Sequence, residues 1–264
     1  MKFLYTLASL AVVSGASAAT HSGHASAELV AASSSYQGAK PVEAAIRLVV
    51  DPEWHTYWTN PGEGGMKLGI EWNLPEGWKA GEVGWPVPGR FMTGELPGFG
   101  YFGEIILPVT LTPPADAKGE VKIGLKVDWL TCNDSACIPG DAALDLSLTA
   151  ADPAPTPSAA LIAKAKEKVP RPVEGLVLDV KEDGKNLVLT LTAPAASDPA
   201  AFQAFPATPQ VVDAAAKIQF AKTGDGWTAT VAKSEYLSGA PKALELVLDG
   251  GKLPHPARVV WEKK

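Results

Sequence analysis

The sequence has few of the residues on which most catalytic sites depend. Among 264 residues there are only two cysteines and four histidines. No nucleophile elbow, phosphate-binding glycine loop or zinc-protease motif is present, and the cysteines do not form a C-x-x-C motif, so a thioredoxin-type active site is not indicated. We therefore expect no cofactor and no bound metal, and the two cysteines become the main candidates for chemistry.

Long apolar runs and excess positive charge are also missing. Beyond residue 18, no stretch approaches the roughly 18 apolar residues that a membrane-spanning helix needs, so we expect a soluble mature chain without membrane insertion. The formal net charge is −6 and no basic patch stands out. Nucleic acid is therefore not an expected partner.

The amino terminus has the pattern of a secretory signal peptide. Lys2 precedes an apolar run, residues 3–13, and the small residues Ala16, Ser17 and Ala18 follow. We predict a signal peptide over residues 1–18, which would export the chain to an oxidising compartment. There is no cysteine at the cleavage site, so we expect no lipid anchor there.

Residues 19–27 are small and polar, and we predict a disordered leader there. His21 and His24 lie three residues apart in this stretch. They could bind a metal weakly, but a flexible segment loses entropy when it is ordered. The interpretation as an unstructured leader is therefore preferred.

The rest of the chain predicts an all-β protein of two domains. Short β-prone runs alternate with turns rich in the 25 glycines and 23 prolines, which is typical of antiparallel sandwiches. We expect a first domain over residues 28–150 and a second, smaller sandwich-like domain over residues 173–264. Residues 151–172 form a proline-rich linker with a short helix, 159–169, capped by Ser158.

The two cysteines flank a tight polar turn. One β-prone run, residues 121–130, leads into Cys132. Another, residues 142–148, follows Cys137. A strand, a short turn and a second strand can bring two such cysteines within disulfide reach. A bond that closes so short a loop contributes only about 2 kcal/mol to stability. On spacing alone, a redox role and a structural role remain equally open.

The charges near the cysteines favour a passive kind of exchange. Asp128 and Asp134 lie close to them in the sequence, and acidic neighbours raise the pKa of a thiol. An activated thiolate on a partner protein would then attack the oxidised pair and form a mixed disulfide. Two further interpretations stay open: a structural disulfide in an interaction or scaffold module, and a reduced pair that binds Cu(I). His55 is expected to be packed or hydrogen-bonded and not catalytic.

Several motifs resemble the amino-terminal periplasmic domain of DsbD-type thiol–disulfide interchange proteins, most closely its ScsB branch, which is associated with copper tolerance. The likeness covers residues 28–150 and extends, more weakly, to residues 155–264. The motifs occur in the same order as in that family: Trp54 to Gly62, Ile70 to Trp72, Trp85 to Pro88, Gly100-Tyr101, Leu107 to Val109, Lys126 to Cys132 and Cys137 to Gly140.

The resemblance implies an immunoglobulin-like sandwich whose redox-active pair is Cys132 and Cys137. It also implies an aromatic cap over the pair, for which Phe91, Phe99 and Tyr101 are the candidates. In the family, Cys137 would be the usual point of attack. The domain would act as a protein-disulfide reductase component in the periplasm, relaying electrons to isomerase-like or thioredoxin-like partners. This sequence has no transmembrane segment and no thioredoxin domain, so two alternatives stay open: the protein docks to a separate membrane reductase, or it has acquired another role.

Overall fold

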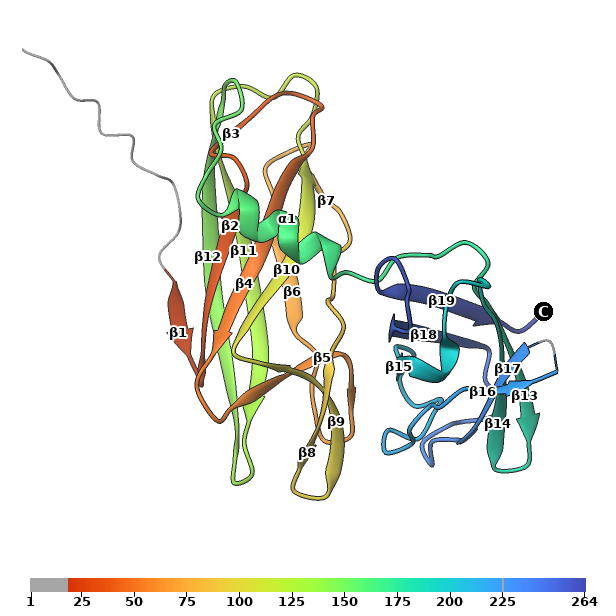
Figure 1. The fold of residues 1–264 in the computed structure, drawn as a ribbon. Coiled ribbons are helices and arrows are strands. Elements are labelled where there is room, and N and C mark those ends of the chain that lie inside the picture. The colour runs from red at the N-terminus through yellow and green to blue at the C-terminus, as the bar shows by residue number, and fades with distance from the viewer. Residues whose placement is uncertain (1–18, 225) are drawn as a thin grey trace, which may run out of the picture.

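The computed structural model describes residues 19–224 and 226–264. It is almost entirely β structure and forms two domains joined by one α-helix and a short extended segment (Figure 1). The all-β class predicted from the sequence is confirmed. The predicted signal peptide, residues 1–18, lies outside the described residues.

Two sheets form the first domain, and they face each other across one core. The five-stranded sheet has the order β1-β2-β4-β10-β7, and the seven-stranded sheet has the order β3-β12-β11-β5-β9-β8, with β6 paired to β11. In the first sheet the strands are β1 (Thr20–Ser22), β2 (Ala25–Ala31), β4 (Val42–Val50), β7 (Lys79–Ala80) and β10 (Glu104–Thr112). In the second they are β3 (Ser35–Tyr36), β5 (His55–Gly62), β6 (Gly69–Asn73), β8 (Gly89–Thr93), β9 (Leu96–Phe102), β11 (Glu120–Cys132) and β12 (Cys137–Ala150).

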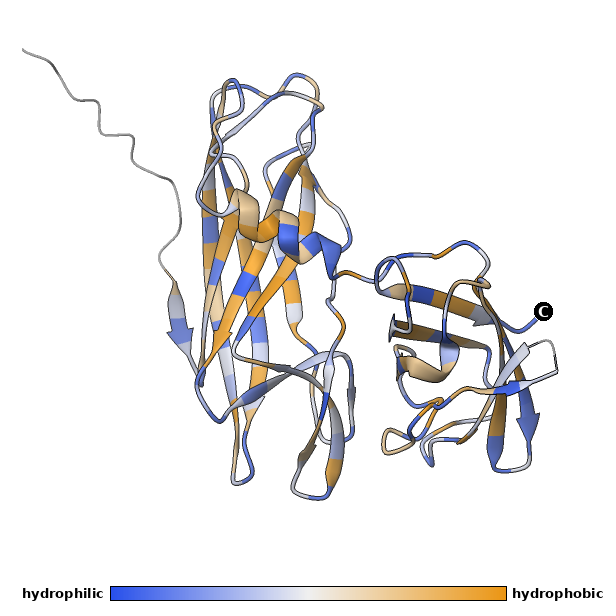
Figure 2. Cartoon of the chain, viewed as in Figure 1, coloured by the Kyte–Doolittle hydropathy of each residue, from blue (hydrophilic) through white to orange (hydrophobic). Residues whose placement is uncertain are grey.

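Alternation of apolar and polar residues sets which face of each strand meets the core. Along β11, Ile123, Leu125, Val127 and Trp129 are buried, whereas Lys122 and Lys126, which alternate with them, are exposed. Because side chains in a strand point alternately to opposite faces, this pattern fixes the odd-numbered residues of β11 on the core side. Figure 2 shows the same alternation as bands of hydrophobic and hydrophilic residues along β4, β11 and β12.

The predicted disordered leader is wrong, because β1 and the start of β2 occupy it. Thr20 pairs with Ala27, and Ala25 and Ala27 are fully buried against β4. Alanine has a weak β propensity, and pairing with a neighbouring strand overrides that local preference. The two histidines of this stretch therefore lie in an ordered hairpin.

A helix packs on the outer face of the five-stranded sheet. It is α1 (Ala159–Glu167), and its buried residues Ile162 and Ala165 join a small cluster with Val30, Ala45 and Ile106. The predicted side-chain cap is wrong: Ser158 makes no side-chain capping bond, and its N–H instead donates to Thr156 Oγ1 at 3.1 Å. Within the described residues, no helix is both long and apolar enough to cross a membrane.

The second domain consists of a four-stranded and a three-stranded sheet around a separate core. Its orders are β13-β14-β17-β16 and β15-β18-β19. The elements are β13 (Val177–Asp183), β14 (Asn186–Thr192), the 3₁₀ turn η1 (Pro199–Ala201), β15 (Phe202–Pro206), β16 (Ala221–Thr223), β17 (Gly226–Ala232), β18 (Ala243–Gly250) and β19 (Ala257–Glu262).

Candidate functional site

The cysteine pair stands at the free end of the longest hairpin in the first domain. The β11–β12 ladder runs from Glu120 opposite Thr149 to Cys132 opposite Cys137. The turn between them is closed by the Asn133 side chain, whose Oδ1 accepts the N–H groups of Ser135 at 2.8 Å and Ala136 at 2.9 Å. Asparagine is favoured in turns because its short side chain makes such local bonds. The turn therefore sets the two cysteines directly opposite each other.

The two cysteines are bonded, and their surroundings differ. Their Cα atoms lie 4.1 Å apart, and they form a disulfide. Cys132 has no exposed surface, whereas Cys137 is exposed. By the alternation along β11, Cys132 lies on the outer face of the sheet, away from the core, where an uncovered side chain would meet water. Something other than the core must therefore cover Cys132.

The cover comes from the neighbouring strands. His55 on β5 lies directly opposite Cys132, so the two side chains share one face of the sheet. The Phe91 ring lies 4.0 Å from the His55 ring and the Phe102 ring lies 5.5 Å from it, centroid to centroid. We call the rings of His55, Phe91 and Phe102 the aromatic cover. It lies on the outer face of the sheet, and its member His55 is the residue that pairs with Cys132.

His55 is held neutral by its surroundings. Its side chain is buried, with 3% of the residue exposed, and Nε2 lies 3.0 Å from Thr93 Oγ1. Burial lowers the pKa of the imidazole, and the negative charge of Asp134 in the cysteine turn opposes that shift. Desolvation disfavours the charged form of a base, so His55 is an uncharged hydrogen-bonding group at neutral pH.

Two glycines on β9 make room for the cover. Gly98 pairs with Phe91, and a Cβ atom there would lie 2.4 Å from the Phe91 ring. A Cβ atom at Gly100 would lie 1.9 Å from the backbone oxygen of Thr56 on β5. Glycine in a strand commonly marks such a close approach. The two positions let the β8–β9 hairpin lie flat against β5 and place Phe91 over Gly98.

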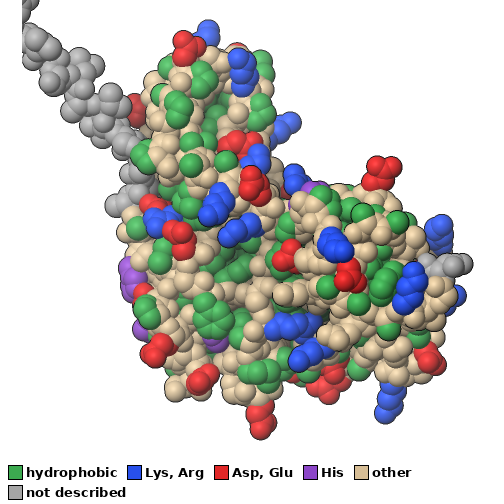
Figure 3. Space-filling model, in the orientation of Figure 1, with side chains coloured by type: hydrophobic (Ala, Val, Ile, Leu, Met, Phe, Trp, Pro, Cys, Tyr) green, Lys and Arg blue, Asp and Glu red, His purple; other side chains and the backbone are tan. Residues whose placement is uncertain are grey.

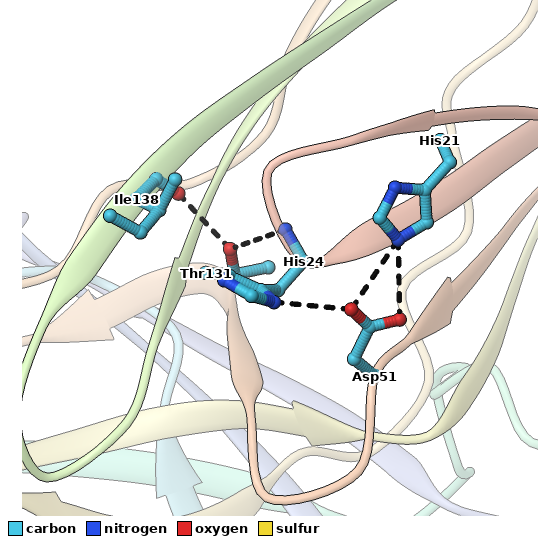
Figure 4. Close-up of polar contacts among 5 residues, drawn as sticks. All are labelled: His21, His24, Asp51, Thr131 and Ile138. Carbon is cyan, nitrogen blue, oxygen red and sulfur yellow. Dashed lines mark hydrogen bonds and ion pairs between the residues drawn. The ribbon is translucent and has the colours of Figure 1, made fainter.

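A hydrogen-bond network that starts from Thr131, next to Cys132, braces the cysteine hairpin (Figure 4). Thr131 Oγ1 donates to the carbonyl of Ile138 at 3.0 Å and accepts the N–H of His24 at 3.2 Å. The imidazoles of His24 and His21 lie 3.1 and 3.3 Å from the Asp51 carboxylate. The amino-terminal hairpin is thereby tied to the residues beside both cysteines.

The candidate cap residues lie on two opposite faces. Phe91 belongs to the aromatic cover, whereas Phe99 packs between Trp58 and Phe205 of the second domain. The Tyr101 hydroxyl donates to the carbonyl of Pro86 at 2.7 Å, and burial raises its pKa well above the usual value. Of the three, only Phe91 contacts the ring of His55, the residue that pairs with Cys132.

The two candidate acidic residues also separate. Asp134 lies in the exposed turn between the cysteines, near enough to His55 to act on its charge. Asp128 lies four residues before Cys132 in β11, and its carboxylate covers Gly69 on β6, where a Cβ atom would lie 2.0 Å from Asp128 Oδ1. Asp134 therefore belongs to the site, and Asp128 contacts the neighbouring strand.

Sequence reasoning missed two members of this site, Phe102 and Thr93. Phe102 is 56% exposed and pairs with His55 across β9 and β5. The sequence did contain a signal. His55 and Tyr57 are two residues apart in one strand and therefore lie on the same face, so residues of the neighbouring strand must pack against them. Which strand that is depends on long-range pairing.

The surface around the pair is partly apolar. Met92, Leu96, Phe102 and Ile138 are large exposed apolar residues of this end of the domain. Figure 3 shows hydrophobic and acidic side chains intermingled at the lower end of the first domain, which carries the hairpin tips in Figure 1. Among the described residues, no group of three or more histidine, cysteine, aspartate or glutamate side chains is arranged to hold a metal ion.

Comparisons with known proteins agree with this geometry. Residues 26–149 match the family model described as the N-terminal part of the thiol:disulfide interchange protein DsbD. The crystal structure of the N-terminal periplasmic domain of ScsB from Proteus mirabilis matches with a TM-score of 0.67 and 22% identity, over 90% of this chain and 93% of that one. A search of curated proteins gave no match. Residues 26–149 thus form a domain of the DsbD N-terminal family.

Proposed function

We propose that this protein exchanges its Cys132–Cys137 disulfide with thiol proteins of the periplasm and relays electrons between them. The observation that carries the proposal is the asymmetry of the pair: an exposed Cys137 is bonded to a Cys132 that has no exposed surface. Exchange requires a thiolate to approach one sulfur, and only Cys137 offers access. Cys132 is then the leaving group.

The exchange balances without a cofactor. A thiolate of a reduced partner attacks Cys137 Sγ, the Cys132–Cys137 bond breaks, and Cys132 leaves as a thiolate. The partner's second thiol passes its proton to Cys132 and attacks the mixed disulfide, which releases Cys137. The partner is now oxidised by two electrons and the pair is reduced. The reverse sequence on a second, oxidised partner reduces that partner and restores the disulfide.

Stability arguments favour this reading over a structural bond. The disulfide lies at the last pair of a long antiparallel ladder, so the strands are already aligned without it. A loop as short as this one gains only about 2 kcal/mol from closure. A staple that served stability would join segments that the sheet does not already hold together.

Trapping with single-cysteine variants tests the proposal. Cys132→Ala keeps the exposed thiol and should accumulate a mixed disulfide with a periplasmic thiol protein, because no resolving cysteine remains. Cys137→Ala is the matched control and should trap none. The adducts are separated on non-reducing gels and identified by mass spectrometry. Equal trapping by both variants, or by neither, contradicts the assignment of Cys137.

The reduction potential separates exchange from a structural bond. We expect equilibration with glutathione to give a value of about −200 to −250 mV, within the range of exchange proteins. A value below about −300 mV is typical of structural disulfides and would replace the proposal with that of a scaffold module. We further propose that the chain is exported and receives electrons from a separate membrane reductase, which pull-down from periplasmic and membrane fractions tests.

A further inference from the structure

Strands β5, β9 and β8 form the end of the seven-stranded sheet that carries the aromatic cover, and this part of the sheet has two different faces. Adjacent residues of β8 point to opposite sides, and Phe91 lies against His55. Its neighbour Arg90 points the other way and reaches the second domain, where Nη1 donates to the carbonyl of Ala214 at 3.1 Å and Nη2 to that of Ala204 at 3.2 Å. One strand therefore contacts the redox site with one residue and the second domain with the next.

Arg90 is fixed by more than these two bonds. Its guanidinium carbon lies 4.8 Å from the centroid of the Phe99 ring and 5.5 Å from that of Phe205. The two rings themselves meet edge to face at 6.3 Å. Cation–π contacts and charge-assisted bonds to carbonyls are strong when they converge on one planar guanidinium. Arg90 as a whole residue is exposed, but its guanidinium is held by the two carbonyls and lies against the two rings.

The contact between the domains also fixes β5 and β9, the strands that follow β8 in the sheet. Trp58 on β5 and Phe99 on β9 are buried with Phe205, Ala214 and Val247 of the second domain. Asn60 Nδ2, also buried, donates to the carbonyl of Pro206 at 2.7 Å. Strands β5, β9 and β8 therefore all contact the second domain on the face opposite the aromatic cover. Among the described strands β8 is the last of this sheet and pairs with β9, so the second domain supplies contacts that strand pairing does not.

We propose that the second domain serves as a fixed support for the aromatic cover, and that Arg90 is the positioning residue through which it holds Phe91 against His55, the residue that pairs with Cys132. The consequence is that attack is confined to Cys137, because Cys132 stays covered. This regulation rests on the proposed exchange function, but the shielding of Cys132 can be measured without any partner.

The test uses the reduced full-length chain and a small alkylating agent. Iodoacetamide labelling followed by peptide mapping gives separate initial rates for Cys132 and Cys137. We expect Arg90→Ala to raise the Cys132 rate by about tenfold, the scale of one lost hydrogen bond to a charged group, and to leave the Cys137 rate unchanged. Arg90→Lys keeps the charge but lacks the planar guanidinium, so its Cys132 labelling rate should lie between those of the wild type and Arg90→Ala.

Two further variants separate support from general loss of stability. Arg258→Ala removes an arginine of the second domain that pairs with Glu245 and does not touch β8, and it should leave both labelling rates unchanged. Phe205→Ala removes the support from the other side and should raise the Cys132 rate as Arg90→Ala does. Thermal melts of each variant confirm that the chain is folded during labelling.

The outcomes decide the proposal whatever happens to the exchange reaction. An unchanged Cys132 rate in Arg90→Ala overturns it, as does an equal rise in Arg258→Ala. The proposal is supported if the Cys132 rate rises in Arg90→Ala and Phe205→Ala but not in Arg258→Ala. This holds even if the single-cysteine variants trap no partner. Failure of trapping would count against the exchange function and not against the support.

Discussion

His55 lies directly opposite Cys132 across β5 and β11, and both side chains are buried although they lie on the outer face of the sheet. An outer face normally carries residues such as Lys122 and Lys126 of the same strand. The exception exists because Phe91 and Phe102 close over His55. The pair of residues thus marks a second, small apolar site outside the main core.

Burial of His55 makes stability depend on pH. The folded state lowers the pKa of this imidazole, so an unfolded chain takes up the proton at a higher pH than the folded chain does. As the pH falls through the ordinary value of about 6.5, the free energy of unfolding should decrease, and it should level off below the pKa of the folded state. Urea unfolding measured between neutral and mildly acidic pH tests this.

Two variants show whether His55 is the cause. His55→Gln keeps a hydrogen-bonding group near Thr93 but does not titrate. The free energy of unfolding of this variant should therefore no longer decrease in this way as the pH falls. Asp134→Asn removes the charge that opposes the shift, so the folded pKa should fall further and the decline should extend to lower pH. An undiminished slope in His55→Gln would assign the effect to other groups.

Reduction of the disulfide should leave the fold intact. Since Cys132 and Cys137 end a ladder that is paired along its whole length, we expect reduction to lower the free energy of unfolding by about 2 kcal/mol or less. Urea titrations with and without reductant give the difference. The double variant Cys132→Ala, Cys137→Ala serves as the control, because its stability should not respond to reductant. Unfolding on reduction would show instead that the bond is structural.

The sequence was sufficient to predict the hairpin and its pair of opposed cysteines, because local alternation and turn residues determine both. It could not choose among the cap candidates. Phe99 and Tyr101 alternate on one face of β9, but which face meets the cysteines follows from the pairing of His55 with Phe102, a contact between distant segments. The same limit explains why Phe102 and Thr93 were missed.

The contact between the domains was equally hidden from the sequence. Arg90 binds backbone carbonyls of Ala204 and Ala214, and a carbonyl is present at every position, so no residue type signals it. The amino-terminal strands were missed for a different reason. Alanines such as Ala25 and Ala27 are buried against β4, and small residues in a polar stretch resemble a flexible leader when only local composition is considered.

The closeness of β9 to β5 depends on Gly100, and a matched glycine pair tests it. Gly89 and Gly100 face each other across β8 and β9, and neither is marked by a positive φ. At Gly100 a Cβ atom would lie 1.9 Å from the Thr56 backbone oxygen, whereas at Gly89 the nearest atom would be 3.6 Å away. We expect Gly100→Ala to destabilise the chain by about 2 kcal/mol or more and Gly89→Ala by less than about 0.5 kcal/mol. Because the first change pushes the hairpin off β5, it should also speed alkylation of Cys132. Equal stability of the two variants in urea unfolding would show that β9 can move away from β5 without cost, and the aromatic cover would then need no close fit of these strands.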